Sequence, residues 1–232
     1  MAAESCPDSE MGIALLFWHV IFACQAVLFD LDGVLVDSTP AVARVWAKWA
    51  LDHGLAPEVA IAHAHGRRSI ETIRALAPEV NAEQENQRVE QMEIEDKEGV
   101  TALPGAARLI GSLPQAQFAI VTSATTALAR ARISYAGLPL PQHLITADDV
   151  KQGKPSPEPY LKGAELLGLR PQDCVVLEDA PAGIASARAA GMRVVALPNT
   201  YSPEELQHAT AVAGSLNEVQ IQVFENSLRL TL

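Results

Sequence analysis

The chain has 232 residues, of which 49% are hydrophobic and 19% are charged, and its formal net charge at pH 7 is −11. This composition supplies a full hydrophobic core and excludes wholesale disorder. The acidic balance argues against a nucleic acid or an anionic membrane surface as a partner, because either would require a basic face. The length fits one large domain, or one domain with a modest insertion.

The N-terminal region contains an apolar run, Ile13 to Ala23. It is too short to span a bilayer by itself. The residues before it include Glu4, Asp8 and Glu10 but no Lys or Arg, which is the wrong charge for a signal peptide. We expect residues 1–23 to be an extension of unclear role that packs poorly or lies on the sheet, with a membrane anchor as the alternative.

The three cysteines, Cys6, Cys24 and Cys174, are scattered and show no spacing typical of a metal site. We interpret them as ordinary thiols of a protein in a reducing compartment, and we therefore expect a cytoplasmic location.

The first predicted strand is the apolar run Val27 to Phe29, and two carboxylates follow it, Asp30 and Asp32. Residues i and i+2 of a strand project to the same side. Two acids held so close repel each other and lose solvation, so a cation, a shared proton or both must compensate. Two acids at this spacing are usually only an acidic turn, unless other parts of the chain supply further ligands.

Residues 41–98 show helical patterns and no strand pattern. Thr39 is expected to cap the first helix, with Pro40 at its first position. The segment from Asn81 to Glu98 predicts a long polar helix. These patterns predict an all-helical cap domain at 41–99, inserted into a core domain made of 24–40 and 100–232.

From Val100 onward, apolar strands alternate with helical segments, which predicts right-handed strand–helix–strand units. The fold class is therefore α/β: a Rossmann-like parallel sheet with helices on both faces, plus the inserted cap. The expected strands after the first are Phe118–Val121, Leu144–Thr146, Cys174–Leu177 and Val194–Leu197, with a weaker signal at Ala211–Ala213.

Polar residues follow three of these strands: Asp30 and Asp32, then Thr122 and Ser123, then Glu178 and Asp179. Ligands of an open parallel sheet bind beyond the carboxyl ends of its strands. Lys154 lies in a Gly/Pro-containing loop after another strand. Carboxylates suit Mg²⁺, which prefers to share its shell with a phosphate. This set of groups predicts phosphoryl transfer to or from a carboxylate.

Four stretches, DLDGVLVDS, VTSAT, GKPSPEPY and VVLEDAPAGIASARAAG, occur in the order that characterises the haloacid dehalogenase superfamily of phosphotransferases. The chain resembles this family from about Cys24 to Leu197. HGRRSIETI, ITADDVKQGKP and LEDAPAG are most similar to the sugar- and polyol-phosphate phosphatases within it. The resemblance implies a small helical cap and a Mg²⁺-dependent phosphatase acting on a small sugar or polyol phosphate through an aspartyl-phosphate.

The resemblance also implies roles for the acidic residues. Asp30 would be the nucleophile, and Asp32 would protonate the leaving alcohol and then deprotonate the attacking water. The Asp30 side chain, the Asp32 backbone carbonyl and Asp179 would hold Mg²⁺, and Glu178 would hold it directly or through water.

Ser123 and the backbone N–H of Ala124 would bind phosphate oxygens, and Lys154 would neutralise the phosphate together with the nucleophile. In the cap, His65 and Arg67 are the expected substrate contacts. Arg68 lies next to them in the sequence, and the alternative for one or both arginines is an ordinary solvated surface charge.

Three other functions stay open on the sequence. A β-phosphoglucomutase-like isomerase and a phosphoglycolate phosphatase would use the same motifs. A catalytically silent binding protein is a more distant alternative, which the intact set of Asp30, Asp32, Lys154 and Asp179 argues against. We expect a monomer with a small phosphorylated sugar or polyol as substrate, and neither nucleic acid nor a membrane as a partner.

Overall fold

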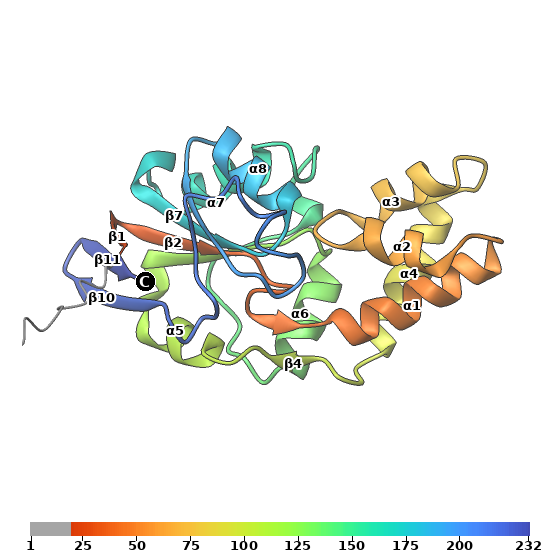
Figure 1. The fold of residues 1–232 in the computed structure, drawn as a ribbon, viewed down its shortest axis with the longest axis horizontal. Helices are drawn as coiled ribbons and strands as arrows, with labels where there is room; N and C mark the ends of the chain where they lie inside the picture. The colour runs from red at the N-terminus through yellow and green to blue at the C-terminus, as the bar shows by residue number, and fades with distance from the viewer. Residues whose placement is uncertain (1–19) are drawn as a thin grey trace, which may run out of the picture.

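The structure is a computed structural model that describes residues 20–232. Its core is a six-stranded parallel sheet with the strand order β6-β5-β2-β7-β8-β9 (Figure 1). The predicted α/β fold with a parallel sheet is confirmed. The strands are β2 (Ala26–Phe29), β5 (Phe118–Val121), β6 (Leu144–Ile145), β7 (Cys174–Glu178), β8 (Arg193–Ala196) and β9 (Ala211–Val212).

The register of the sheet brings the polar strand ends together. The four residues of β2 are fully buried, which fits a central strand covered on both faces. Phe29, the last residue of β2, is paired with Ile120 of β5 and with Leu177 of β7. The residues that follow these three strands therefore lie side by side at one edge of the sheet.

Helices cover both faces of the sheet. In Figure 1, α5 (Ala106–Ser112) and α6 (Thr126–Tyr135) lie below it, whereas α7 (Glu158–Leu166) and α8 (Pro181–Ala189) lie above it. The hydrophobic core is divided accordingly, because alternate residues of each strand face opposite sides. Short 3₁₀ turns occupy Gln115–Gln117, Ala147–Asp149 and Pro171–Asp173.

Four helices form the cap, which lies at the end of the molecule opposite the C-terminus (Figure 1). They pack around their own apolar cluster, in which Trp46 and Trp49 lie edge to face. Two short antiparallel strands, β3 (Val36–Asp37) and β4 (Thr101–Ala102), lie where the chain leaves the core and returns to it. The cap helices are α1 (Thr39–Asp52), α2 (Pro57–Ala64), α3 (Ser69–Leu76) and α4 (Ala82–Glu95).

The start of α1 differs from the expectation by one residue. The helix begins at Thr39 and its N-cap is Ser38, whose hydroxyl makes no capping bond. That hydroxyl donates to Asp32 Oδ1 at 2.7 Å instead. The prediction that Thr39 is the N-cap is wrong, because Thr39 is already the first helical residue. Ser38, which occupies the N-cap position, links the start of the cap to Asp32.

A second sheet, not expected from the sequence, joins the two ends of the described chain. It is antiparallel and contains β1 (Ile21–Cys24), β11 (Ser227–Thr231) and β10 (Gln220–Phe224). Part of the expected extension at 1–23 is therefore a strand. Most of the apolar run that begins at Ile13 lies outside the described residues, as does Cys6.

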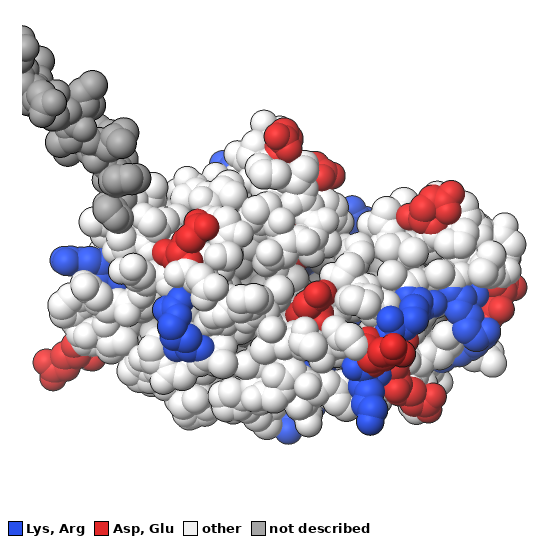
Figure 2. All heavy atoms as spheres, turned by 60° about the horizontal axis from the view of Figure 1, so that its bottom comes forward, with Lys and Arg blue, Asp and Glu red and all other residues white. Residues whose placement is uncertain are grey.

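The two cysteines within residues 20–232, Cys24 and Cys174, are buried and unpaired, as expected of ordinary thiols. Among the helices of this described part, none is long and apolar enough to cross a membrane. On the face drawn in Figure 2, acidic and basic side chains are interspersed over the cap, without a large patch of one sign.

Candidate active site

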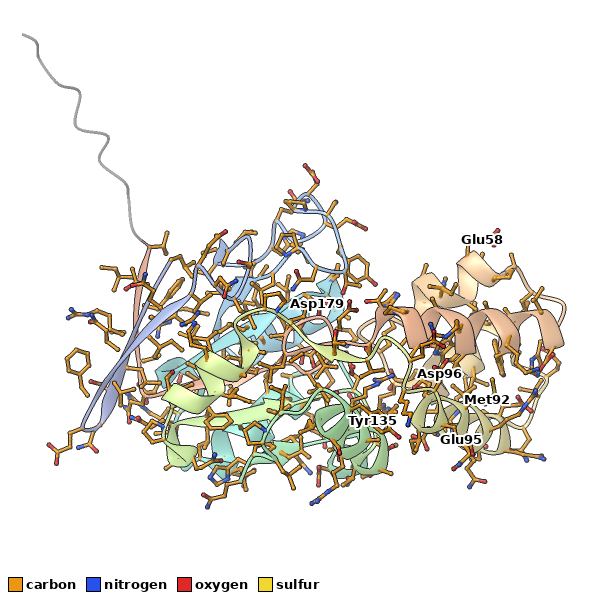
Figure 3. The ribbon with its side chains drawn as sticks, turned by 90° about the horizontal axis from the view of Figure 1, so that it is seen from below. Glu58, Met92, Glu95, Asp96, Tyr135 and Asp179 are labelled. Atoms are coloured by element: carbon orange, nitrogen blue, oxygen red, sulfur yellow. The ribbon has the colours of Figure 1, made fainter. Side chains whose placement is uncertain are left out.

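The site lies between the cap and the carboxyl ends of β2, β5 and β7. A cavity there is lined by Asp30 and Asp32 from the first loop, Ser123 and Ala124 from the second, and His65 and Arg67 from the cap. The structure thus brings these predicted site residues to one place. Figure 3 shows Asp179 at the end of the core that faces the cap.

The nucleophile expected from the sequence, Asp30, is held through one of its two oxygens. Lys154 Nζ lies 3.0 Å from Asp30 Oδ1, and the backbone N–H of Leu31 donates to the same oxygen at 2.8 Å. Among residues 20–232, no group donates a hydrogen bond to the second oxygen, Oδ2. An ionised Asp30 therefore has one oxygen fixed and the other available for chemistry.

Burial raises the pKa of Asp30 to about 7, although the positive charge of Lys154 opposes the shift. For Lys154, burial favours the neutral amine, but the carboxylates of Asp30 and Glu178 outweigh this effect and raise its pKa above the ordinary value. Lys154 is therefore a permanent cation at this position.

Glu178 holds Lys154 in place. Its Oε1 accepts from Lys154 Nζ at 2.8 Å and from the Tyr160 hydroxyl at 3.0 Å. Its Oε2 accepts from the backbone N–H groups of Asp179 and Ala180 at 2.8 and 2.9 Å. Both oxygens of this fully buried carboxylate are thus already occupied.

Three buried carboxylates could together hold a metal ion. Asp30, Glu178 and Asp179 each offer an oxygen, and these oxygens lie within 4.8 Å of one another. Burial and the neighbouring carboxylates raise the pKa of Asp179 well above its ordinary value. Lys154 supplies a single positive charge to the group, so ionisation of all three acids leaves two negative charges that require a cation or protons.

The phosphate-binding expectations fall on the loop after β5. Ser123 Oγ donates to the backbone carbonyl of Gly66 in the cap at 3.3 Å. The backbone N–H of Ala124 donates to Thr122 Oγ1 at 3.1 Å, so a phosphate oxygen would replace Thr122 as its acceptor. Both groups line the cavity together with Asp30.

In the cap, the two expected substrate contacts lie at the cavity, whereas the neighbouring Arg68 does not. His65 and Arg67 line the cavity, and burial lowers the pKa of His65 even though Asp32 partly opposes the shift. Arg68 forms an ion pair with Glu71. Burial thus favours the neutral form of His65, which is suited to hydrogen bonding with a hydroxylated substrate.

Several residues of the site were not expected from the sequence. Arg132 of α6 donates to Asp32 Oδ2 at 2.7 Å and to Glu93 Oε2 at 3.2 Å, and Trp46 Nε1 donates to Glu93 Oε1 at 3.0 Å. Glu93 lies in the polar helix α4 and Arg132 in α6, and neither residue belongs to a motif or stands out by spacing. Trp46, which packs in the apolar cluster of the cap, also lines the cavity.

Comparison with known proteins gives a consistent result. The model of the family "haloacid dehalogenase-like hydrolase" matches residues 24–191. Hexitol phosphatase A of Escherichia coli is 48% identical over 85% of this chain and 94% of its own length. Glycerol-1-phosphate phosphohydrolase 2 of Saccharomyces cerevisiae is 38% identical, over 79% of this chain and 78% of its own. A crystal structure of a hydrolase from Pseudomonas syringae superposes with a TM-score of 0.74 at 28% identity, over 83% of this chain and 94% of that one.

Proposed function

The chain belongs to the haloacid dehalogenase-like hydrolase family, and from this membership and its site we propose that it is a Mg²⁺-dependent phosphatase of small sugar or polyol phosphates. It is a hydrolase of phosphoric monoesters, as the names of hexitol phosphatase A and glycerol-1-phosphate phosphohydrolase 2 say of those two relatives. The identity to a hexitol phosphatase favours a linear polyol phosphate as substrate.

The observation that carries the proposal is the pairing of Asp30 with Lys154. One oxygen of the carboxylate is neutralised by the ammonium group at 3.0 Å, and the other faces no donor among the described residues. An incoming phosphate brings at least one further negative charge to this place, so a positive charge beside the nucleophile is needed. A surface acidic turn would not retain a lysine with its side chain fully buried.

The residues fit a divalent cation. Asp30 and Asp179 would ligate it through their carboxylates, with the Asp32 carbonyl as a third protein ligand, and Glu178 would act through water because its oxygens are engaged by other donors. Mg²⁺ would neutralise the phosphate oxygens and the excess negative charge of the acidic group.

The proposed reaction uses both aspartates. Asp30 Oδ2 attacks phosphorus, and the bond to the substrate's alkoxide oxygen breaks. Asp32 gives its proton to that oxygen, so the alcohol leaves and an aspartyl-phosphate forms on Asp30. Asp32 then takes a proton from water as the water attacks phosphorus, which releases inorganic phosphate and restores both acids.

Substrate binding is assigned to both sides of the cavity. Ser123 and the Ala124 N–H would hold phosphate oxygens, and Arg67 and His65 of the cap would contact the hydroxylated part of the substrate. The cap residues that line the cavity would limit the size of the organic part. We further infer a monomeric, cytoplasmic enzyme, which size-exclusion chromatography and cell fractionation would test.

The test is turnover of a panel of hexitol, glycerol, hexose and glycolate phosphates with Mg²⁺, followed by release of inorganic phosphate. We expect release, fastest with a polyol phosphate. A fastest rate with phosphoglycolate would move the assignment to a phosphoglycolate phosphatase. Conversion of one sugar phosphate into another without free phosphate would identify a mutase, and no reaction at all would favour a binding protein.

A further inference from the structure

We propose that Arg132 and Glu93 are positioning residues that orient Asp32 for proton transfer and make this orientation depend on the cap. The inference rests on the role of Asp32 in the proposed phosphatase reaction. Neither residue belongs to one of the catalytic motifs. Arg132 lies in α6 of the core, and Glu93 lies in α4 of the cap.

Both carboxylate oxygens of Asp32 accept a hydrogen bond from another side chain. Ser38 Oγ donates to Oδ1 at 2.7 Å, and Arg132 Nη1 donates to Oδ2 at 2.7 Å. Asp30 is held differently, through Lys154 and a backbone N–H. The two neighbouring aspartates are thus fixed by separate cations, which gives each one its own direction at the cavity.

Arg132 is in turn fixed by the cap. Its guanidinium is buried, and Nη2 donates to Glu93 Oε2 at 3.2 Å. Glu93 is also buried, and its second oxygen accepts from Trp46 Nε1 at 3.0 Å. A buried carboxylate is stabilised by a nearby cation, so opening the cap would separate Glu93 from its cation, although Arg132 would keep Asp32 and Glu93 would keep Trp46. The chain of contacts Asp32–Arg132–Glu93–Trp46 therefore favours the closed arrangement.

The helices that carry the pair are in contact elsewhere too. The Tyr135 hydroxyl, at the end of α6, donates to the carbonyl of Ile94 in α4 at 2.7 Å. Figure 3 shows Tyr135 on the side of α6 that lies toward α4, where Glu95 and Asp96 are labelled. The Arg132–Glu93 contact is thus the buried part of a core–cap interface and is not an isolated surface ion pair.

The consequence for catalysis concerns the leaving group. An alkoxide needs a proton as it leaves, whereas p-nitrophenolate does not. If Arg132 orients Asp32, its replacement slows transfer from an alkyl phosphate far more than transfer from p-nitrophenyl phosphate. A general loss of packing or of phosphate binding would slow both substrates equally, because they share the same phosphoryl group.

The experiment compares kcat/KM for glycerol phosphate and for p-nitrophenyl phosphate in Arg132→Lys and Glu93→Gln. We expect the alkyl-to-aryl ratio to fall by about 10-fold or more in Arg132→Lys and to fall, by less, in Glu93→Gln. The double variant should resemble Arg132→Lys alone, since the two residues act through one contact. The exposed residues Arg130 and Glu95 lie on the same two helices, so Arg130→Lys and Glu95→Gln are matched controls.

An unchanged ratio in folded Arg132→Lys and Glu93→Gln, or additive effects in the double variant, would overturn the inference. Thermal melting establishes folding, and the nearly isosteric Glu93→Gln keeps the test informative where Arg132→Lys unfolds. Failure of the proposed function is a different result, because the unmodified protein would then release phosphate from neither substrate.

Discussion

Lys154 Nζ and Asp30 Oδ1 lie 3.0 Å apart, and both side chains are buried. Replacement of Lys154 by Met would leave the carboxylates of Asp30 and Glu178 without their cation. We expect activity to fall by about 10²-fold or more, together with a loss of several kcal/mol in the free energy of unfolding. Activity assays and urea melts would measure the two effects. The exposed Lys151→Met is the control, and similar losses in both variants would contradict the role of Lys154.

Asp30→Asn removes the nucleophile while preserving the shape of the side chain. Turnover should fall by about 10³-fold or more, with Tm close to that of the unmodified protein or above it, because burial of the ionised carboxylate is unfavourable. Steady-state kinetics and a thermal melt provide the measurements. Residual activity within about 10-fold of the original would exclude Asp30 as the phosphorylated residue.

The binding of Mg²⁺ should depend on pH with a definite sign. Burial raises the pKa of Asp30 from 3.8 to about 7, and it also raises the pKa of Asp179. Between these pH values the folded metal-free protein therefore retains protons that the unfolded chain has released. Its stability should therefore decrease as pH rises from about 4 to about 7. Mg²⁺ competes with these protons, so its affinity should increase over the same range.

Differential scanning fluorimetry with and without Mg²⁺ would test this dependence. We expect the Mg²⁺-induced rise in Tm to be larger at about pH 8 than at about pH 5, and EDTA to abolish it reversibly together with activity. Asp179→Asn is the matched variant and should lose most of the Mg²⁺ effect. A rise in Tm of equal size at both pH values would contradict binding through these carboxylates.

Gly183 of α8 lies so close to the Glu178 side chain that position 183 has no room for a Cβ atom. A Cβ built on Gly183 would lie 1.5 Å from Glu178 Oε1, so an alanine there must displace the carboxylate that anchors Lys154. We expect Gly183→Ala to reduce activity by about 10-fold or more and to lower Tm. Gly111 in α5 has no atom within 4 Å of a built Cβ, so Gly111→Ala should be neutral or stabilising. Equal Tm values for the two variants would show that Glu178 moves freely.

The core of the fold could be predicted from the sequence because its signals are local. Apolar runs such as Phe118–Val121 and Cys174–Leu177 end in polar residues, and the rule for parallel sheets then places those residues at one edge. The strands β10 and β11 were missed, because β10 is mostly exposed and β11 pairs with β1 at the opposite end of the described chain. The two segments alternate polar and apolar residues, but a local pattern does not reveal the distant strand with which each pairs.

The candidate site was predictable to the same extent. Asp30, Lys154 and Asp179 belong to motifs whose order along the chain indicates one chemistry. Arg132 and Glu93 follow no motif, and only the packing of the cap against α6 brings them together. Residues that position a catalytic group from another element are set by tertiary contacts, so a single sequence does not reveal them.

The most direct test of the proposed activity is phosphorus NMR of the purified protein with Mg²⁺ and a hexitol phosphate. Growth of the inorganic phosphate signal at the expense of the ester, absent in Asp30→Asn and stopped by EDTA, is the result we predict. Loss of the ester without inorganic phosphate, or an ester signal unchanged by the active protein, would contradict the assignment of this protein as a polyol-phosphate phosphatase.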